Sequence, residues 1–197
     1  MTLRRTLSAL RRDDAGATLV EFALLLPVLM MTLMGLFDLA YNMYTSSMLN
    51  GSIQKVARDS TIEGASTGSL DANVTKAVKA IVPGATLTFT RKSYSSFTKV
   101  GRAEDYTDVN TDGVCNANEP YEDANGNGSW DSDVGLAGQG GARDAVLYTV
   151  KVTYQRAFPV ASFVGMSNTF TTSSSMVLRN QPYGLQNEVT SSMGNCI

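Results

Sequence analysis

Residues 17–44 read ATLVEFALLLPVLMMTLMGLFDLAYNMY, and this stretch decides how the rest of the chain is organised. Within it, Phe22–Phe37 contains no charged residue and is bounded by Glu21 and Asp38. A helix needs about 20 mainly apolar residues to cross the hydrocarbon core, so the stretch suffices if the two carboxylates lie at the interfaces or find partners. The alternative is a buried core helix, but such helices rarely run so long without a polar face. The stretch therefore predicts a membrane-spanning helix.

Close to this stretch, positive charge lies only on its amino-terminal side. Arginines occupy positions 4, 5, 11 and 12, and the next basic residue is Lys55. Because basic flanks stay in the cytoplasm, the remainder of the chain is predicted to lie outside it. A secretory signal peptide would end in small residues at a cleavage site after its apolar core, and this stretch lacks that ending. Met48, Ile53 and Val56 continue a helical spacing, which predicts a stalk beyond the membrane.

The residues GATLVEFALLLP, at positions 16–27, resemble the start of TadE-like pseudopilins, which are minor pilins of the bacterial Flp/Tad pilus system. In type IV prepilins generally, a prepilin peptidase cleaves after Gly and leaves Glu as the fifth residue of the mature chain. Here the bond would be Gly16–Ala17, and Glu21 is fifth when counted from Ala17. The resemblance implies that Glu21 pairs with the α-ammonium of a neighbouring subunit. The alternative is that Glu21 lies unpaired at the headgroup level.

The same resemblance implies a domain organisation, partners and a location. The organisation is a cleaved leader at 1–16, a transmembrane and stalk helix at 17–62, and an extracytoplasmic pilin-like domain at 63–197. The implied partners are other pilins or pseudopilins, the prepilin peptidase, the inner membrane and the pilus assembly platform. The protein would reside in the bacterial inner membrane with its outer domain in the periplasm, and in the extracellular pilus after assembly. The net charge of -2 gives no reason to expect nucleic acid as a partner.

The residues after the stalk predict an α+β fold. Apolar residues at 74, 77, 78 and 81 predict a short second helix, with Ser69 or Asp71 at its start and Pro83-Gly84 after its end. Alternating residues predict strands around Leu87 and Phe89 and over residues 146–155, and a third strand is predicted around residues 170–178. We therefore expect a long amino-terminal helix packed on a small antiparallel sheet, with an insertion between the first two strands.

The insertion, residues 103–142, is strongly acidic. It contains no Lys or Arg but nine of the 18 carboxylates of the chain. A disordered acidic loop is one interpretation of this composition. The spacing of the oxygen-bearing residues favours a second one, which is that the insertion binds calcium.

Two series in the insertion match the spacing of a calcium loop. The first occupies positions 1, 3, 5, 7, 9 and 12 with Asp108, Asn110, Asp112, Val114, Asn116 and Glu119, and has Gly113 at position 6. The second has Asp123, Asn125, Asn127, Ser129 and Asp131 at positions 1, 3, 5, 7 and 9. Its twelfth residue is Val134, so Asp133 or Glu122 would have to replace the missing carboxylate. We expect one calcium ion in the first loop and a weaker or ligand-sharing site in the second, without flanking helices.

The two cysteines, Cys115 and Cys196, form no CxxC motif. In an oxidising periplasm they are candidates for a disulfide between the first loop and the carboxyl terminus. The alternative is that Cys115 is a free, packed residue.

The composition argues against an enzyme. Because the chain has no His, Ser-His-Asp and Cys-His sites and His-ligated zinc are excluded. The carboxylates form no recognisable grouping of base, nucleophile and pocket, so a metal-dependent enzyme is not expected. The main alternative to a pseudopilin is a surface adhesin or binding domain that is anchored by an uncleaved leader and uses the acidic insertion to contact a ligand.

Overall fold

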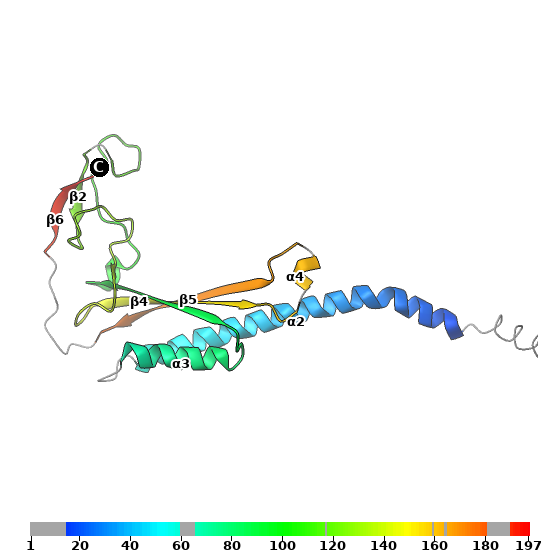
Figure 1. Ribbon diagram of the computed structural model, residues 1–197. Helices are drawn as coiled ribbons and strands as arrows, with labels where there is room; N and C mark the ends of the chain where they lie inside the picture. The colour runs from blue at the N-terminus through cyan, green and yellow to red at the C-terminus, as the bar shows by residue number, and fades with distance from the viewer. Residues whose placement is uncertain (1–14, 60–65, 117, 159, 164, 181–189) are drawn as a thin grey trace, which may run out of the picture. The chain divides into compact units, whose positions relative to one another are not determined.

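The structure of the protein is a computed structural model that describes residues 15–59, 66–116, 118–158, 160–163, 165–180 and 190–197. Its helices are α2 (Ala15–Asp59), α3 (Thr67–Lys79) and α4 (Val160–Phe163), with a 3-10 turn η1 (Phe97–Lys99). Its strands are β1 (Thr86–Tyr94), β2 (Pro120–Asp123), β3 (Leu136–Ala137), β4 (Ala145–Gln155), β5 (Thr169–Arg179) and β6 (Ser192–Asn195) (Figure 1). The predicted leader, residues 1–16, lies almost entirely outside the described residues.

The chain divides into two compact units. The first contains the described residues up to Tyr44 together with Gln155–Phe170, and the second contains Thr45–Tyr154 with Thr171–Ile197. The elements α2, β4 and β5 contribute residues to both units.

The amino-terminal part of α2, in the first unit, exposes apolar side chains. Phe22, Leu24 and Leu36 are 57%, 73% and 62% exposed, and the most apolar 18-residue window has none of its residues buried. The helix is long and apolar enough to cross a membrane. The predicted long amino-terminal apolar helix is therefore confirmed.

The second unit contains two helical segments, each of which buries one row of apolar side chains. The carboxyl-terminal part of α2 buries Leu49, Ile53 and Val56, which recur at the spacing of one helical face. α3 buries Leu70, Val74 and Val78 at the same kind of spacing. The two helices lie side by side and line a common pocket (Figure 1).

The start of α3 differs from the expected one. The helix begins at Thr67, and the Oγ of Ser66 accepts a hydrogen bond from the backbone N–H of Ser69 at 3.2 Å. Ser66 is thus the N-cap, and the expectation of a cap at Ser69 or Asp71 is wrong. The serine just before the helix can accept this bond because its own backbone is still extended.

The main sheet is antiparallel between β1 and β4 and has the strand order β3-β1-β4-β5. Alternate residues of β4 are buried, among them Tyr148, Val150 and Val152, which are fully enclosed. The residues between them, such as Lys151, include exposed polar side chains. The three predicted strands and the α+β fold are confirmed. β2, β3 and β6 were not predicted because each is too short to show an alternating pattern.

One ion pair joins α3 to the sheet. Asp71 accepts hydrogen bonds from the guanidinium of Arg91 on β1 and, at 2.7 Å, from the hydroxyl of Tyr148 on β4. The guanidinium also lies over the Tyr148 ring, 4.6 Å from its centroid. Burial, followed by the hydrogen bond to Asp71, raises the pKa of Tyr148. A single carboxylate therefore satisfies two donors from different strands.

We predict that Asp71→Ala lowers the free energy of unfolding by about 2 kcal/mol, because it leaves both donors without their charged acceptor. Asn73→Ala is the matched control, since Asn73 is exposed on the same helix. Denaturant unfolding of the detergent-solubilised chain measures both. Equal stability of the two variants would contradict the structural role of Asp71.

Candidate functional site

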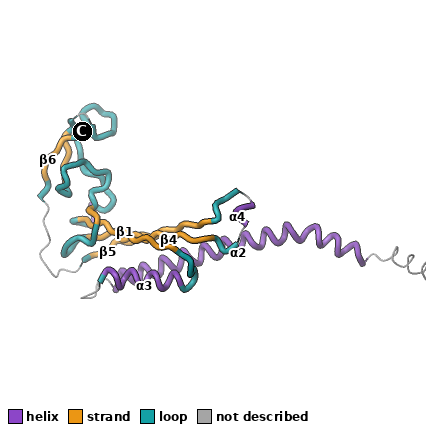
Figure 2. Tube along the Cα trace, viewed as in Figure 1, coloured by secondary structure: helices purple, strands orange, loops and turns teal. Residues whose placement is uncertain are grey.

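The acidic insertion lies between β1 and β4 and consists mostly of loops (Figure 2). A small apolar cluster of Tyr94, Val134 and Ala145 joins it to the main sheet. Over the described part of residues 103–142 there is no helix on either side of the two predicted calcium loops. The loops are therefore held by their own hydrogen bonds and by packing on the sheet.

The first loop is closed by its own side chains. The Asp108 carboxylate accepts hydrogen bonds from the backbone N–H groups of Asp112 and Gly113, at 3.2 and 2.9 Å. Asn110 Oδ1 accepts from the N–H of Asp112, and Asp112 Oδ1 accepts from the N–H of Val114. Gly113 has φ +77°, which a residue with a side chain rarely adopts. Positions 1, 3 and 5 thus turn their oxygens toward the inside of the loop.

The second loop repeats this arrangement position by position. The Asp123 carboxylate accepts from the N–H groups of Asn127 and Gly128, at 3.2 and 2.9 Å, and also from Gly126. Asn125 Oδ1 accepts from the N–H of Asn127, and Asn127 Oδ1 accepts from the N–H of Ser129. Gly128, at position 6, has φ +80°. The two loops therefore share one backbone conformation through position 7.

Glu119 holds the two ends of the first loop together. Its Oε1 accepts from the N–H of Val109, at position 2, and its Oε2 accepts from the N–H of Asn116, at position 9. The residue is only 2% exposed. A carboxylate at position 12 that reaches across the loop in this way is where a bidentate calcium ligand is expected.

In the second loop, Glu104 does what Glu119 does in the first. Its Oε1 accepts from the N–H of Ala124, at position 2, and its Oε2 accepts from the N–H of Asp131, at position 9, at 2.8 and 3.1 Å. Glu104 is 3% exposed. The carboxylate that the second series lacks at its twelfth position is thus replaced by one that precedes the whole loop in the chain. The sequence analysis did not identify Glu104, because no linear spacing relates it to the loop.

The two residues considered earlier for this role lie elsewhere. Asp133 accepts hydrogen bonds from Lys92 Nζ and the Tyr94 hydroxyl, at 2.6 and 3.0 Å, so it ties the insertion to β1. The hydrogen bond from Lys92 contributes to lowering the pKa of Asp133, although burial alone would raise it. Glu122 is exposed on β2. The structure therefore brings neither carboxylate to the position equivalent to Glu119.

Amide groups and carboxylates alternate inside both loops. Asn110 Nδ2 and Asn116 Nδ2 donate to Asp112 Oδ2, and Asn125 Nδ2 and Asn127 Nδ2 donate to Asp131 Oδ2. Among the described residues, no three acidic or cysteine side chains form a group that could hold a metal ion by themselves. Amide and backbone oxygens would have to complete the coordination of a cation in either loop.

The loops create a concentrated negative field. Hydrogen bonds from the Asn116 side chain and the backbone lower the pKa of Asp112. Burial raises the pKa of Asp123, but three backbone N–H groups outweigh it and the net shift is downward. Tyr121 has a raised pKa, first from burial and then from the charges of Asp123, Glu104 and Asp131. The lowered pKa values favour the ionised forms of Asp112 and Asp123, and ionised carboxylates attract cations.

A second small sheet and a disulfide connect the first loop to the end of the chain. β2 pairs antiparallel with β6, and Cys196 exchanges backbone hydrogen bonds with Asn118 and Glu119. The structure joins Cys115 to Cys196 in a disulfide with a Cα–Cα separation of 5.4 Å. The last residues of the chain thus brace the first loop at position 8.

We predict that protein isolated under non-reducing conditions contains no alkylatable thiol. Replacing both Cys115 and Cys196 with Ser is expected to lower the free energy of unfolding by about 3 to 5 kcal/mol, because the closed loop is long. Alkylation followed by mass spectrometry tests the first statement, and denaturant unfolding tests the second. Recovery of two alkylated cysteines would contradict the disulfide.

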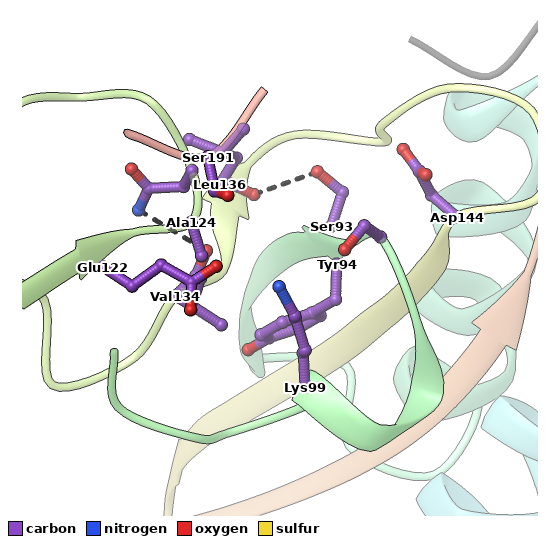
Figure 3. Close-up of a pocket in the computed structure, with 11 residues that line it drawn as sticks. Ser93, Tyr94, Lys99, Glu122, Ala124, Val134, Leu136, Asp144 and Ser191 are labelled. Atoms are coloured by element: carbon purple, nitrogen blue, oxygen red, sulfur yellow. Dashed lines mark hydrogen bonds between the residues drawn. The ribbon is translucent and has the colours of Figure 1, made fainter. Parts of the chain in front are cut away.

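A pocket opens where the second loop meets the end of β1 (Figure 3). Its lining is mostly polar and includes Ser93, Lys99 and Glu122. Asn125, which also lines it, donates weakly to the carbonyl of Val134 at 3.5 Å. The second loop thus forms part of the pocket wall.

The residues of the predicted processing site lie on the first turns of α2. Gly16, Ala17 and Glu21 are all exposed, and a Cβ added at Gly16 would meet no atom within 4 Å. Residues 16–58 of the chain match the family model described as TadE-like protein. The amino-terminal segment is TadE-like. No curated protein and no solved structure matches the chain.

The TadE-like segment coincides almost entirely with α2. It includes both the exposed apolar part of the helix and the stripe that packs in the second unit. The match ends at residue 58, so both acidic loops lie outside it. The TadE-like resemblance seen at residues 16–27 is thereby confirmed, and it points to a role in the Tad pilus system.

Proposed function

We propose that the protein is a minor pseudopilin of a Tad/Flp-type pilus that is incorporated through α2 and carries a calcium-stabilised outer domain. The observation that supports this most directly is that the TadE-like match coincides with a helix whose amino-terminal part is apolar and exposed. Such a surface requires a cover of lipid or of neighbouring helices. A pilus subunit would be surrounded by lipid in the inner membrane and by the helices of neighbouring subunits after assembly into the fibre.

Glu21 is proposed to fix how far one α2 helix is shifted along its neighbour in the assembly. The carboxylate is exposed on the first turns of α2, one residue before the charge-free stretch begins. A carboxylate at the membrane boundary is costly unless it is paired. The α-ammonium that cleavage would create at Ala17 of a neighbouring subunit is the partner we propose.

We predict that the mature chain begins at Ala17 and that Gly16→Ala leaves the leader attached. Because a Cβ at Gly16 meets open space, the substitution should change recognition by the peptidase and not the fold. Gly35→Ala is the matched control, since a Cβ there also meets no atom within 4 Å. Amino-terminal sequencing of protein from membranes and from sheared filaments measures processing and location together.

In the same assay, Glu21→Ala should be cleaved and inserted normally but recovered less from filaments, since only the pairing carboxylate is lost. Wild-type protein that still begins at Met1 in cells with an active pilus system would rule out the pseudopilin. That result would favour a membrane-anchored adhesin.

The outer domain is proposed to bind calcium in the first loop through Asp108, Asn110, Asp112, Asn116, Glu119 and the carbonyl of Val114. These groups supply the several oxygen ligands that Ca²⁺ requires. On binding, the Nδ2 groups of Asn110 and Asn116 would give up their present hydrogen bonds to Asp112, which frees the Asp112 carboxylate for the ion. Only side chains would have to move, because the backbone turn of the loop is already formed.

A second ion is proposed for the second loop, with Glu104 as the carboxylate that bridges its ends. The remaining ligands are Asp123, Asn125, Asn127 and Asp131, with the carbonyl of Ser129. The support for this assignment is that Glu104 and Glu119 bind the equivalent backbone groups of their loops. Both carboxylates are buried, and the described residues form no salt bridge with either. A buried charge is costly without a counter-charge, which Ca²⁺ would supply.

We predict that calorimetry on the detergent-solubilised chain shows two saturable calcium sites. Glu119→Gln should remove the first site and Glu104→Gln the second, while Glu122→Gln, in an exposed residue, should remove neither. Calcium at 100 times its dissociation constant should stabilise the fold by roughly 2.7 kcal/mol per site. Trp130 donates to the Glu104 carbonyl at 3.0 Å, so its fluorescence should follow occupation of the second loop.

Magnesium is the control for diffuse attraction, because it demands a tighter octahedral geometry. Calcium binding is disproved if no saturable binding occurs at millimolar calcium and the melting temperature is equal in calcium and in chelator. If Glu122→Gln removes the second site and Glu104→Gln does not, the assignment of Glu104 is wrong, but calcium binding by the loops still stands.

A further inference from the structure

The connection from β4 to β5, residues 156–168, is called the tip here and belongs to the first unit. It contacts α2 at the end of the charge-free stretch of the helix. Arg156, the first residue after β4, forms an ion pair with Asp38, and Asn42 Nδ2 donates to the same carboxylate at 3.1 Å. One residue earlier on the helix, Phe37 stacks on Phe158 with ring centroids 6.1 Å apart. The connection from β4 to β5 thus contacts the helix at the residue where its apolar stretch ends.

Arg156 also organises the tip itself. Its backbone N–H donates to the carbonyl of Asn168 and its Nε donates to the carbonyl of Ser167, at 2.7 and 3.1 Å. The guanidinium lies over the Phe170 ring, 5.2 Å from its centroid. The tip is therefore a closed structure held by one arginine, which is itself held by Asp38.

The surface of the tip exposes two large apolar side chains and no charged one. Phe163 is 72% exposed and Met166 is 57% exposed, and residues 157–170 include no charged side chain. Phe158, which precedes α4, contacts Phe37 of α2, and the neighbouring helix residues Leu36 and Leu39 are also exposed. Apolar surface of the tip and of the helix thus lies in the same unit.

The length of the charge-free stretch gives the depth of the tip in a membrane. A helix rises about 1.5 Å per residue, so Glu21 and Asp38 stand about 25 Å apart along α2. The hydrocarbon core is about 30 Å thick, so the two carboxylates lie near its opposite boundaries when α2 spans it. The Asp38–Arg156 pair then lies at the outer headgroup level, and aromatic and amphipathic groups are favoured at that level.

We propose that the tip, with Phe163 and Met166 at its surface, is a second membrane contact that inserts into the outer interface of the phospholipid bilayer. The proposal rests on α2 spanning the membrane before assembly, as in the proposed function. The ion pair of Asp38 and Arg156 fixes the tip at the correct depth, and the absence of charge lets the tip enter the interface. The outer domain is therefore held to the membrane at two places.

The test uses tryptophan reporters in the full chain, reconstituted into phosphatidylcholine vesicles that contain brominated lipids. Trp130→Phe removes the natural tryptophan and keeps an aromatic ring against Tyr106. Phe163→Trp reports the tip, Leu29→Trp the middle of the helix, and Val109→Trp, at a 70% exposed residue of the first loop, an aqueous position.

We expect bromines near the headgroups to quench Phe163→Trp most, with a blue-shifted emission. Deep bromines should quench Leu29→Trp most, and neither lipid should quench Val109→Trp. Quenching of Leu29→Trp without quenching of Phe163→Trp would overturn the proposal and leave membrane insertion of α2 intact. Protection of Phe163→Trp from both lipid and aqueous acrylamide would overturn it in favour of contact with a second copy. Absence of quenching in Leu29→Trp would disprove the membrane insertion on which both rest.

Discussion

The structure depends on a single continuous helix that has two different surfaces. In its amino-terminal part α2 exposes apolar side chains such as Leu24 and Leu36, so no amphipathic face orients it against a protein core. In its carboxyl-terminal part only a stripe through Leu49, Ile53 and Val56 is apolar and buried. The main sheet needs this stripe and that of α3 to remove one of its faces from water. The helix that requires a lipid or protein cover is therefore the same helix on which the second unit folds.

The change from one surface to the other occurs near Asp38. A carboxylate at this position would be costly beside apolar surroundings, and the structure compensates it with Arg156 from the connection between β4 and β5. Since the charge is neutralised by a distant part of the chain, the end of the apolar stretch is also the point at which the hairpin is fixed. One ion pair thus serves both the electrostatics of the helix and the position of the tip.

The acidic insertion also contains carboxylates that need partners, but most of these partners are not basic side chains. Its carboxylates are satisfied by backbone N–H groups, by asparagine amides and, for Asp133, by Lys92. These donors order the loops but leave most of the negative charge in place. The proposed calcium ions would neutralise that charge. The disulfide and β6 connect the first loop to the end of the chain.

The sequence alone determined the features that depend on neighbouring residues. The charge-free stretch predicted α2 and the alternation in residues 146–155 predicted β4. The spacing from Asp108 to Glu119 predicted a calcium loop, and the tight turn at Gly113 that such a loop needs is present. Each follows from local periodicity or from a turn that glycine permits. Only the tertiary structure placed Glu104 against the second loop and Arg156 against Asp38. These partners are distant in the chain, and which buried charge meets which donor is decided when the sheet and its connections pack together.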